Sequence, residues 1–162
     1  MSGLCETIIL TAGLLALGCA VAQPAGGGHA PTEEWQKVEV KGRFSFSIPP
    51  DIKRTSAAGT DSLVGEYRGA NVSLGFDYGW YSDPLEYRGK TNYQESSIEI
   101  DGRRAKLVTF RRTGGPNDFA NFAGIHFADL GDEQNKLTMW AGYHNEADLD
   151  QVKKIFQSIK FL

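Results

Sequence analysis

The chain after residue 35 alternates apolar and polar residues over short segments, a pattern typical of strands that bury one face. Two hairpins are predicted in its first half, and the paired segments are 38–40 with 44–48 and 63–68 with 72–80. Pro49-Pro50 ends the first hairpin, because proline cannot donate to a strand ladder. The segment 51–60 is ambiguous and is interpreted as a helical turn.

The clearest hairpin surrounds Asp101-Gly102, between segments 95–100 and 103–112. An Asp-Gly pair supplies the two positive φ angles that a type I′ turn requires. Leu107 and Val108 are both apolar, which indicates that the sheet is covered on both faces there. Segments 122–130 and 137–143 form the last predicted pair.

One helix is predicted, capped by Asn145 and running from Glu146 to about Ser158. An apolar stripe on it would face the sheet, formed by Leu149, Val152, Phe156 and Ile159. The predicted fold class is therefore α+β, with an antiparallel sheet of about six to eight strands in hairpins. We expect further short helices to complete an α/β/α sandwich.

The N-terminal segment has a different pattern. An uncharged apolar run extends from Ile8 to Ala22 and is closed by Ala20-Val21-Ala22. About 15 residues span roughly 22 Å as a helix, which is short of a bilayer core of about 30 Å. We therefore predict an export signal over residues 1–22, a flexible Gly/Pro linker over 23–34 and a single α+β domain over 35–162.

Cys19 offers a second interpretation of the same segment. Ala16-Leu17-Gly18-Cys19 resembles a bacterial lipobox, in which the cysteine becomes the lipidated first residue. The two main alternatives are therefore cleavage after Ala22 and lipidation at Cys19, and an uncleaved anchor is the third. We expect an exported protein, periplasmic or extracellular, with membrane attachment only if Cys19 is lipidated.

Composition narrows the function further. The formal net charge is −3 and the two signs alternate along the chain, which argues against a nucleic-acid partner because such partners need clustered cations. The two cysteines, Cys5 and Cys19, both lie in the export segment. The remainder of the chain therefore contains neither a thiolate nucleophile nor a disulfide.

The strand from Gly42 to Pro49, the series of hairpins and a closing helix through Ile155 to Phe161 resemble the PsbP/Mog1-type fold group. The resemblance implies an antiparallel sheet sandwiched by helices, in exported bacterial proteins of unknown role. It also implies accessory or binding modules that share no enzymatic site, so no functional residue is carried over.

His126 and His144 suggest a metal site, which the predicted register excludes. If positions that sum to about 264 face one another, His144 opposes residue 120, roughly 20 Å from His126. Both histidine nitrogens of a shared ion lie about 2 Å from the metal. The sequence also lacks a nucleophile elbow, a dinucleotide fingerprint and a P-loop, so we predict no catalytic residue, metal or cofactor.

The most distinctive stretch runs from Phe76 to Tyr87 and contains five aromatic residues in twelve. Strand parity sends Phe76, Tyr78 and Trp80 to one face, which favours a core stripe. Residues beyond the strand are harder to bury and could form a binding rim. The candidate binding residues are Trp80, Tyr81, Asp83, Tyr87 and Arg88.

These observations favour a non-catalytic binding or accessory module that is exported to the cell envelope and has a protein partner there. Two alternatives stay open at this point. One is a small hydrolase that uses carboxylate chemistry, and the other is a carrier of a lipid or small ligand. An enclosed apolar cavity would favour the carrier, and a cleft with clustered carboxylates would favour the hydrolase.

Overall fold

Two antiparallel sheets and one helix make up the computed structural model, which describes residues 34–57, 59–113, 119–131 and 134–162. The predicted export signal, its lipobox-like Cys19 and all but the last residue of the linker lie outside the described residues. Within those residues, no helix is long and apolar enough to cross a membrane.

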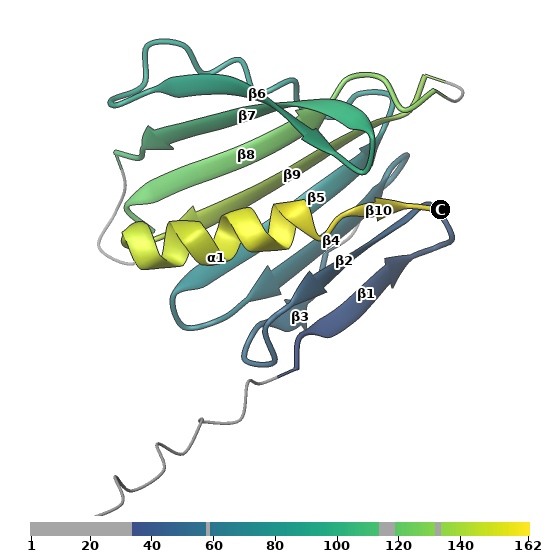
Figure 1. Ribbon diagram of the computed structural model, residues 1–162, viewed down its shortest axis with the longest axis horizontal. Coiled ribbons are helices and arrows are strands. Elements are labelled where there is room, and N and C mark those ends of the chain that lie inside the picture. Colours follow the sequence, from purple (N-terminus) through teal and green to yellow (C-terminus); the bar gives the residue numbers. More distant parts are fainter. Residues whose placement is uncertain (1–33, 58, 114–118, 132–133) are drawn as a thin grey trace, which may run out of the picture. The chain divides into compact units, whose positions relative to one another are not determined.

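The large sheet has seven strands in the order β3-β4-β5-β9-β8-β7-β6 (Figure 1). Their bounds are Lys53–Thr55 for β3, Leu63–Arg68 for β4, Val72–Gly79 for β5, Gln94–Ile100 for β6, Arg103–Arg111 for β7, Asn121–Phe127 for β8 and Lys136–Tyr143 for β9. The small sheet has the order β1-β2-β10, with β1 at Gln36–Val40, β2 at Phe44–Ile48 and β10 at Lys160–Phe161. The helix α1 spans Glu146–Gln157.

The predicted α+β class and the four hairpins are confirmed. The β6–β7 turn has φ angles of 52° at Asp101 and 72° at Gly102, as a type I′ turn requires. In the last hairpin Asn121 faces Tyr143, so the register that sums to 264 is also confirmed. The interpretation of segment 51–60 as a helical turn is wrong, because Lys53–Thr55 form strand β3, which pairs with the end of β4.

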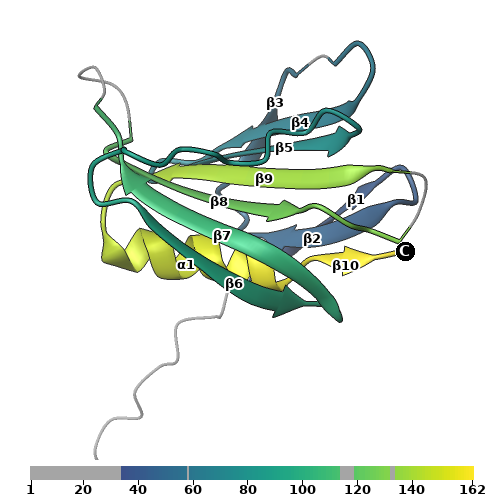
Figure 2. The same ribbon diagram turned by 90° about the horizontal axis from the view of Figure 1, so that it is seen from above.

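The covering of the large sheet differs from the expected α/β/α sandwich. In the described part of the chain α1 is the only helix, and the small sheet shares the inner face of the large sheet with it (Figures 1 and 2). The outer face carries the segment between β5 and β6, which packs Leu85 and Tyr87 on this face of β7 and β8. Tyr93, near the end of the segment, packs on the same cluster, so an irregular segment covers this face in place of a helix.

The core lies between β2 and the inner face of β5. Phe44 and Phe46 of β2 contact Phe76 of β5 edge-on, with ring centroids 5.3 and 6.0 Å apart. Such perpendicular pairs are favourable because the positive edge of one ring meets the negative face of the other. These contacts attach the small sheet to the large one.

The helix begins with a capping box. The side chain of Asn145 accepts the backbone N–H of Asp148, and the carboxylate of Asp148 accepts the N–H of Asn145. Its buried residues include three members of the predicted stripe, Leu149, Val152 and Phe156, while Ile159 is buried just beyond the helix. The sequence therefore specifies both where the helix begins and which side faces the sheet.

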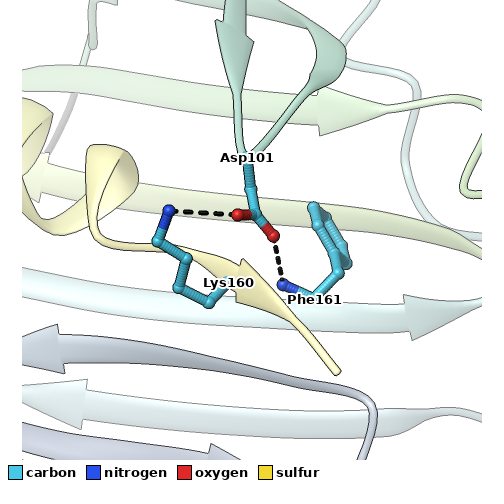
Figure 3. Close-up of polar contacts among 3 residues, drawn as sticks. All are labelled: Asp101, Lys160 and Phe161. Atoms are coloured by element: carbon cyan, nitrogen blue, oxygen red, sulfur yellow. Dashed lines mark hydrogen bonds and ion pairs between the residues drawn. The ribbon is translucent and has the colours of Figure 1, made fainter.

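A carboxylate at the β6–β7 turn holds the last strand (Figure 3). Asp101 accepts the backbone N–H of Phe161 at 2.8 Å and the Nζ of Lys160 at 3.0 Å. These two donors hold the pKa of Asp101 below its usual range. On the side of β10 that faces β2, the N–H of Leu162 donates to the backbone oxygen of Arg43. Asp101 therefore lies on the other, outer edge of β10.

Replacing Phe156 tests the packing of the helix. Its side chain is 1% exposed, so Phe156→Ala should lower the free energy of unfolding by about 3–5 kcal/mol in a denaturant titration. The exposed neighbour Lys154 supplies the control, since Lys154→Ala should change stability by less than about 0.5 kcal/mol. A loss below about 1 kcal/mol for Phe156→Ala would show that this face is not packed on the sheet.

Candidate functional site

A hollow of about 770 Å³ lies where the β1–β2 turn meets the end of β5. We call it the end groove. Its lining residues are Lys41, Arg43, Gly59, Thr60, Asp61, Ser62, Leu63, Asp77, Tyr78, Gly79, Trp80, Tyr81 and Asn135. Figure 1 shows the β1–β2 turn, the end of β10 and the start of β9 at the same right-hand end of the domain. The groove therefore combines segments from both sheets.

Trp80 and Tyr81 are the exposed aromatic residues of this groove, at 55% and 85% exposure. The expectation that Trp80 continues the buried stripe of β5 is wrong, because β5 ends at Gly79 and the chain turns there. The hydroxyl of Ser82 fixes this turn by donating to the backbone oxygen of Asp77 at 2.8 Å. The turn directs both rings away from the core.

Charged side chains of both signs line the groove. Lys41 and Arg43 come from the β1–β2 turn, where Lys41 has a positive φ of 41°. Asp61 comes from the segment before β4, and Asp77 comes from β5 of the large sheet. The Oδ1 atom of Asp77 is buried without a hydrogen-bond partner among the described residues, an arrangement that costs about 1–3 kcal/mol.

The other candidate residues lie on the outer face of the large sheet instead. The carboxylate of Asp83 accepts the backbone N–H of Leu85 at 2.7 Å and the hydroxyl of Tyr87. The Tyr87 ring packs edge-on against Phe110 and Phe122, with centroids 5.2 and 5.6 Å away. Burial and the Asp83 hydrogen bond raise the pKa of Tyr87 to about 12.

Arg88 points into solvent next to the edge strand β6. Its side chain is 83% exposed, and its Nε lies 3.8 Å from the Glu95 carboxylate. The structure thus separates the five candidates by position. Trp80 and Tyr81 line the end groove, Asp83 and Tyr87 fix the segment between β5 and β6, and Arg88 lies beyond it.

The small residues of β5 have a packing role on the outer face. A Cβ atom at Gly75 would lie 2.5 Å from the indole ring of Trp140 on the neighbouring strand. Glycine is therefore required where this ring approaches the backbone of β5. The close neighbour of Gly75 is thus a side chain of the adjacent strand β9.

His126 takes part in a buried hydrogen-bond chain. Its Nδ1 lies 2.8 Å from the Thr138 hydroxyl, which donates to the backbone oxygen of Asp83 at 2.7 Å. Because that hydroxyl uses its proton on Asp83, His126 must donate from a protonated Nδ1. His144 follows the end of β9, at the opposite end of this strand from Thr138. No group of three or more His, Cys, Asp or Glu side chains that could hold a metal occurs within the described ranges.

No sequence pattern identifies Lys41 and Arg43 as groove residues. Their turn meets the end of β5 only because the small sheet packs on the large sheet. Asp61 could not be assigned either, since it precedes β4 in a segment without periodicity. Three-dimensional packing creates the charged part of this site.

Comparison with known proteins identifies the fold. No family model matches the chain, and no curated protein sequence matches it. The solution structure of cyanobacterial PsbP (CyanoP) from Synechocystis sp. PCC 6803 matches with a TM-score of 0.54 and 14% sequence identity. The match covers 85% of this chain and 98% of that one. The chain therefore has a PsbP-like fold, which confirms the resemblance found in the sequence, and at this identity the match shows the fold alone.

Protonation of His126 should destabilise the domain. Burial lowers its pKa from the ordinary value of 6.5, and Lys106 and Lys136 lower it further, against an opposing effect of Asp83. The unfolded chain then binds the proton more tightly, so stability is complete above about pH 6.5 and falls as the pH drops below it.

Denaturant titrations at pH 7.5 and pH 5.5 would measure this loss of unfolding free energy. His126→Gln should reduce the difference between the two pH values, whereas His144→Gln should retain it. An equal pH dependence in wild type and His126→Gln would contradict the assignment.

Proposed function

We propose that this protein is a non-catalytic accessory module of the cell envelope that binds a protein partner at the end groove. The observation that supports this most is the pair of exposed aromatic residues, Trp80 and Tyr81. Together with Leu162 they are the large apolar side chains that are exposed in the described part of the chain.

Two adjacent exposed rings suit protein recognition. Tryptophan and tyrosine supply a large contact area with few rotatable bonds, and they are enriched among the residues that dominate binding energy. Ser82 holds the backbone of the turn that carries them, so a partner need not order this backbone on binding. Neither ring belongs to the hydrophobic core.

The chemistry of the groove supports a protein partner over an apolar small ligand. Its lining alternates aromatic, hydroxyl, cationic and anionic side chains, and it opens to solvent. Carrier pockets are predominantly apolar and bury most of their ligand. The PsbP-like fold agrees with an accessory role, since the resemblance implies binding modules of this kind.

The location in the cell envelope rests on the N-terminal sequence. Mass spectrometry of the mature chain should find a start at Gln23 or a lipidated Cys19. Cys19→Ser separates the two, because it should release the protein from the membrane fraction only if Cys19 carries lipid. An intact Met1 on cytoplasmic protein would contradict export.

The partner site can be tested by photo-crosslinking in cells. A photoreactive residue at position 81 should capture a protein of defined mass, and one at the exposed position 154 on α1 should not. Trp80→Ala with Tyr81→Ala should leave the unfolding free energy within about 0.5–1 kcal/mol of wild type, since both rings are exposed.

The same double variant should also abolish a crosslink placed at the groove residue Asn135. Equal capture from positions 81 and 154, or an undiminished crosslink in the double variant, would overturn the site. A large loss of stability would instead show that the rings belong to the core.

A further inference from the structure

A free strand edge offers unpaired backbone groups to any other strand, and proteins block or cover most such edges. In the described part of the chain the edge strands are β3 and β6 of the large sheet and β1 and β10 of the small sheet. Asp101 already occupies the outer edge of β10 (Figure 3). The other three edges differ in the charges that would meet if each strand paired with the same strand of a second copy.

In the register centred on its middle residue, each of the edges β3 and β6 would set like charges opposite each other in a self-pair. An antiparallel pair of β3 strands centred on Arg54 sets the two Arg54 side chains opposite each other. An antiparallel pair of β6 strands centred on Ser97 sets Glu95 of each copy opposite Glu99 of the other. Like charges directly opposite in a sheet are destabilising.

The edge of β1 is self-complementary. In an antiparallel pair centred on Val38, Lys37 of each copy faces Glu39 of the other, and the two Val38 side chains face each other. Within one chain, Lys37 and Glu39 face only Ser47 and Ser45 of β2. Both charged side chains are exposed, and neither forms an ion pair with a described residue.

We propose that two copies of this protein associate through β1 in this register, which joins their small sheets into one sheet of six strands. The pairing keeps every side chain on its own face, because residues of equal parity meet. Parallel pairing centred on Val38 would instead set Lys37 against Lys37 and Glu39 against Glu39. Charge therefore selects the antiparallel arrangement.

A hollow next to β1 supports an incoming strand. It measures about 340 Å³ and borders Val38 and Val40 of β1, with Leu63, Tyr67 and Phe76 of the large sheet on its other side. Glu39, Lys41, Arg54 and Ser62 also line it, so the space left unfilled along this edge is partly apolar and partly polar. A second strand beside β1 would cover it and add apolar burial to the two ion pairs.

The two-fold arrangement places the end grooves of the two copies far from each other. The β1–β2 turn that lines the groove follows β1 directly, and the two β1 strands run in opposite directions. The two grooves of a pair therefore face opposite ends. A pair could hold two partner sites at once, although the pairing itself does not depend on what the groove binds.

Co-expression of two differently tagged full-length copies tests the pairing, with recovery of the second tag on purification of the first as the readout. Wild-type copies should co-purify, and about 0.5 M salt should weaken this. With Lys37→Glu in both copies, or Glu39→Lys in both, recovery should fall roughly tenfold because like charges now meet.

The decisive combination is one Lys37→Glu copy with one Glu39→Lys copy, which restores opposite charges at both contacts and should restore recovery. Lys154→Glu in both copies, on the exposed side of α1, is the control and should leave recovery unchanged. No recovery with wild type, full recovery with either single variant in both copies, or no rescue by the mixed pair would each overturn the proposal.

Discussion

The contact between β2 and β5 is the interaction on which the rest of the domain depends. The small sheet is a hairpin with a third strand of only two residues, and an isolated hairpin is marginally stable at best in water. Phe44 and Phe46 place it on Phe76 and Tyr78 of the large sheet, and this sets the position of the β1–β2 turn. The end groove exists because the turn comes to rest beside the end of β5. Stability and the candidate site therefore share one apolar layer.

The aromatic residues between β5 and β6 divide into two roles by small differences in position. Tyr87 reaches back to Phe110 and Phe122 and is fixed by Asp83, so its hydroxyl is used inside the molecule. Trp80 and Tyr81 lie in the turn directly after β5, where no second layer covers them. Because Asp83 and Tyr87 anchor the segment after these two rings, the rings can be exposed while the segment keeps its position. Composition alone does not reveal this division, since all three residues belong to one aromatic-rich stretch.

Local chemistry explains what was predictable from the sequence. The Asp101-Gly102 turn and the Asn145 cap each specify an element without help from distant residues, and both were predicted correctly. The division into two sheets was not predicted, because it depends on which strands pair outside their own hairpins, and the free side of β2 pairs with β10 rather than with a strand of the large sheet. Trp80 was misplaced for a related reason. Alternation predicts the face of a residue only while the strand continues, and the end of a strand carries no periodic signal.

The pairing of Phe161 with Phe44 joins segments that are far apart in sequence, and β5 likewise pairs with β9 across the middle of the large sheet. Contacts of this kind form slowly, because a long loop must close before any of them is made. During synthesis, β5 lacks its partner β9 and β2 lacks its partner β10 until these strands have left the ribosome. The large sheet of the nascent protein should therefore close only near the end of its synthesis.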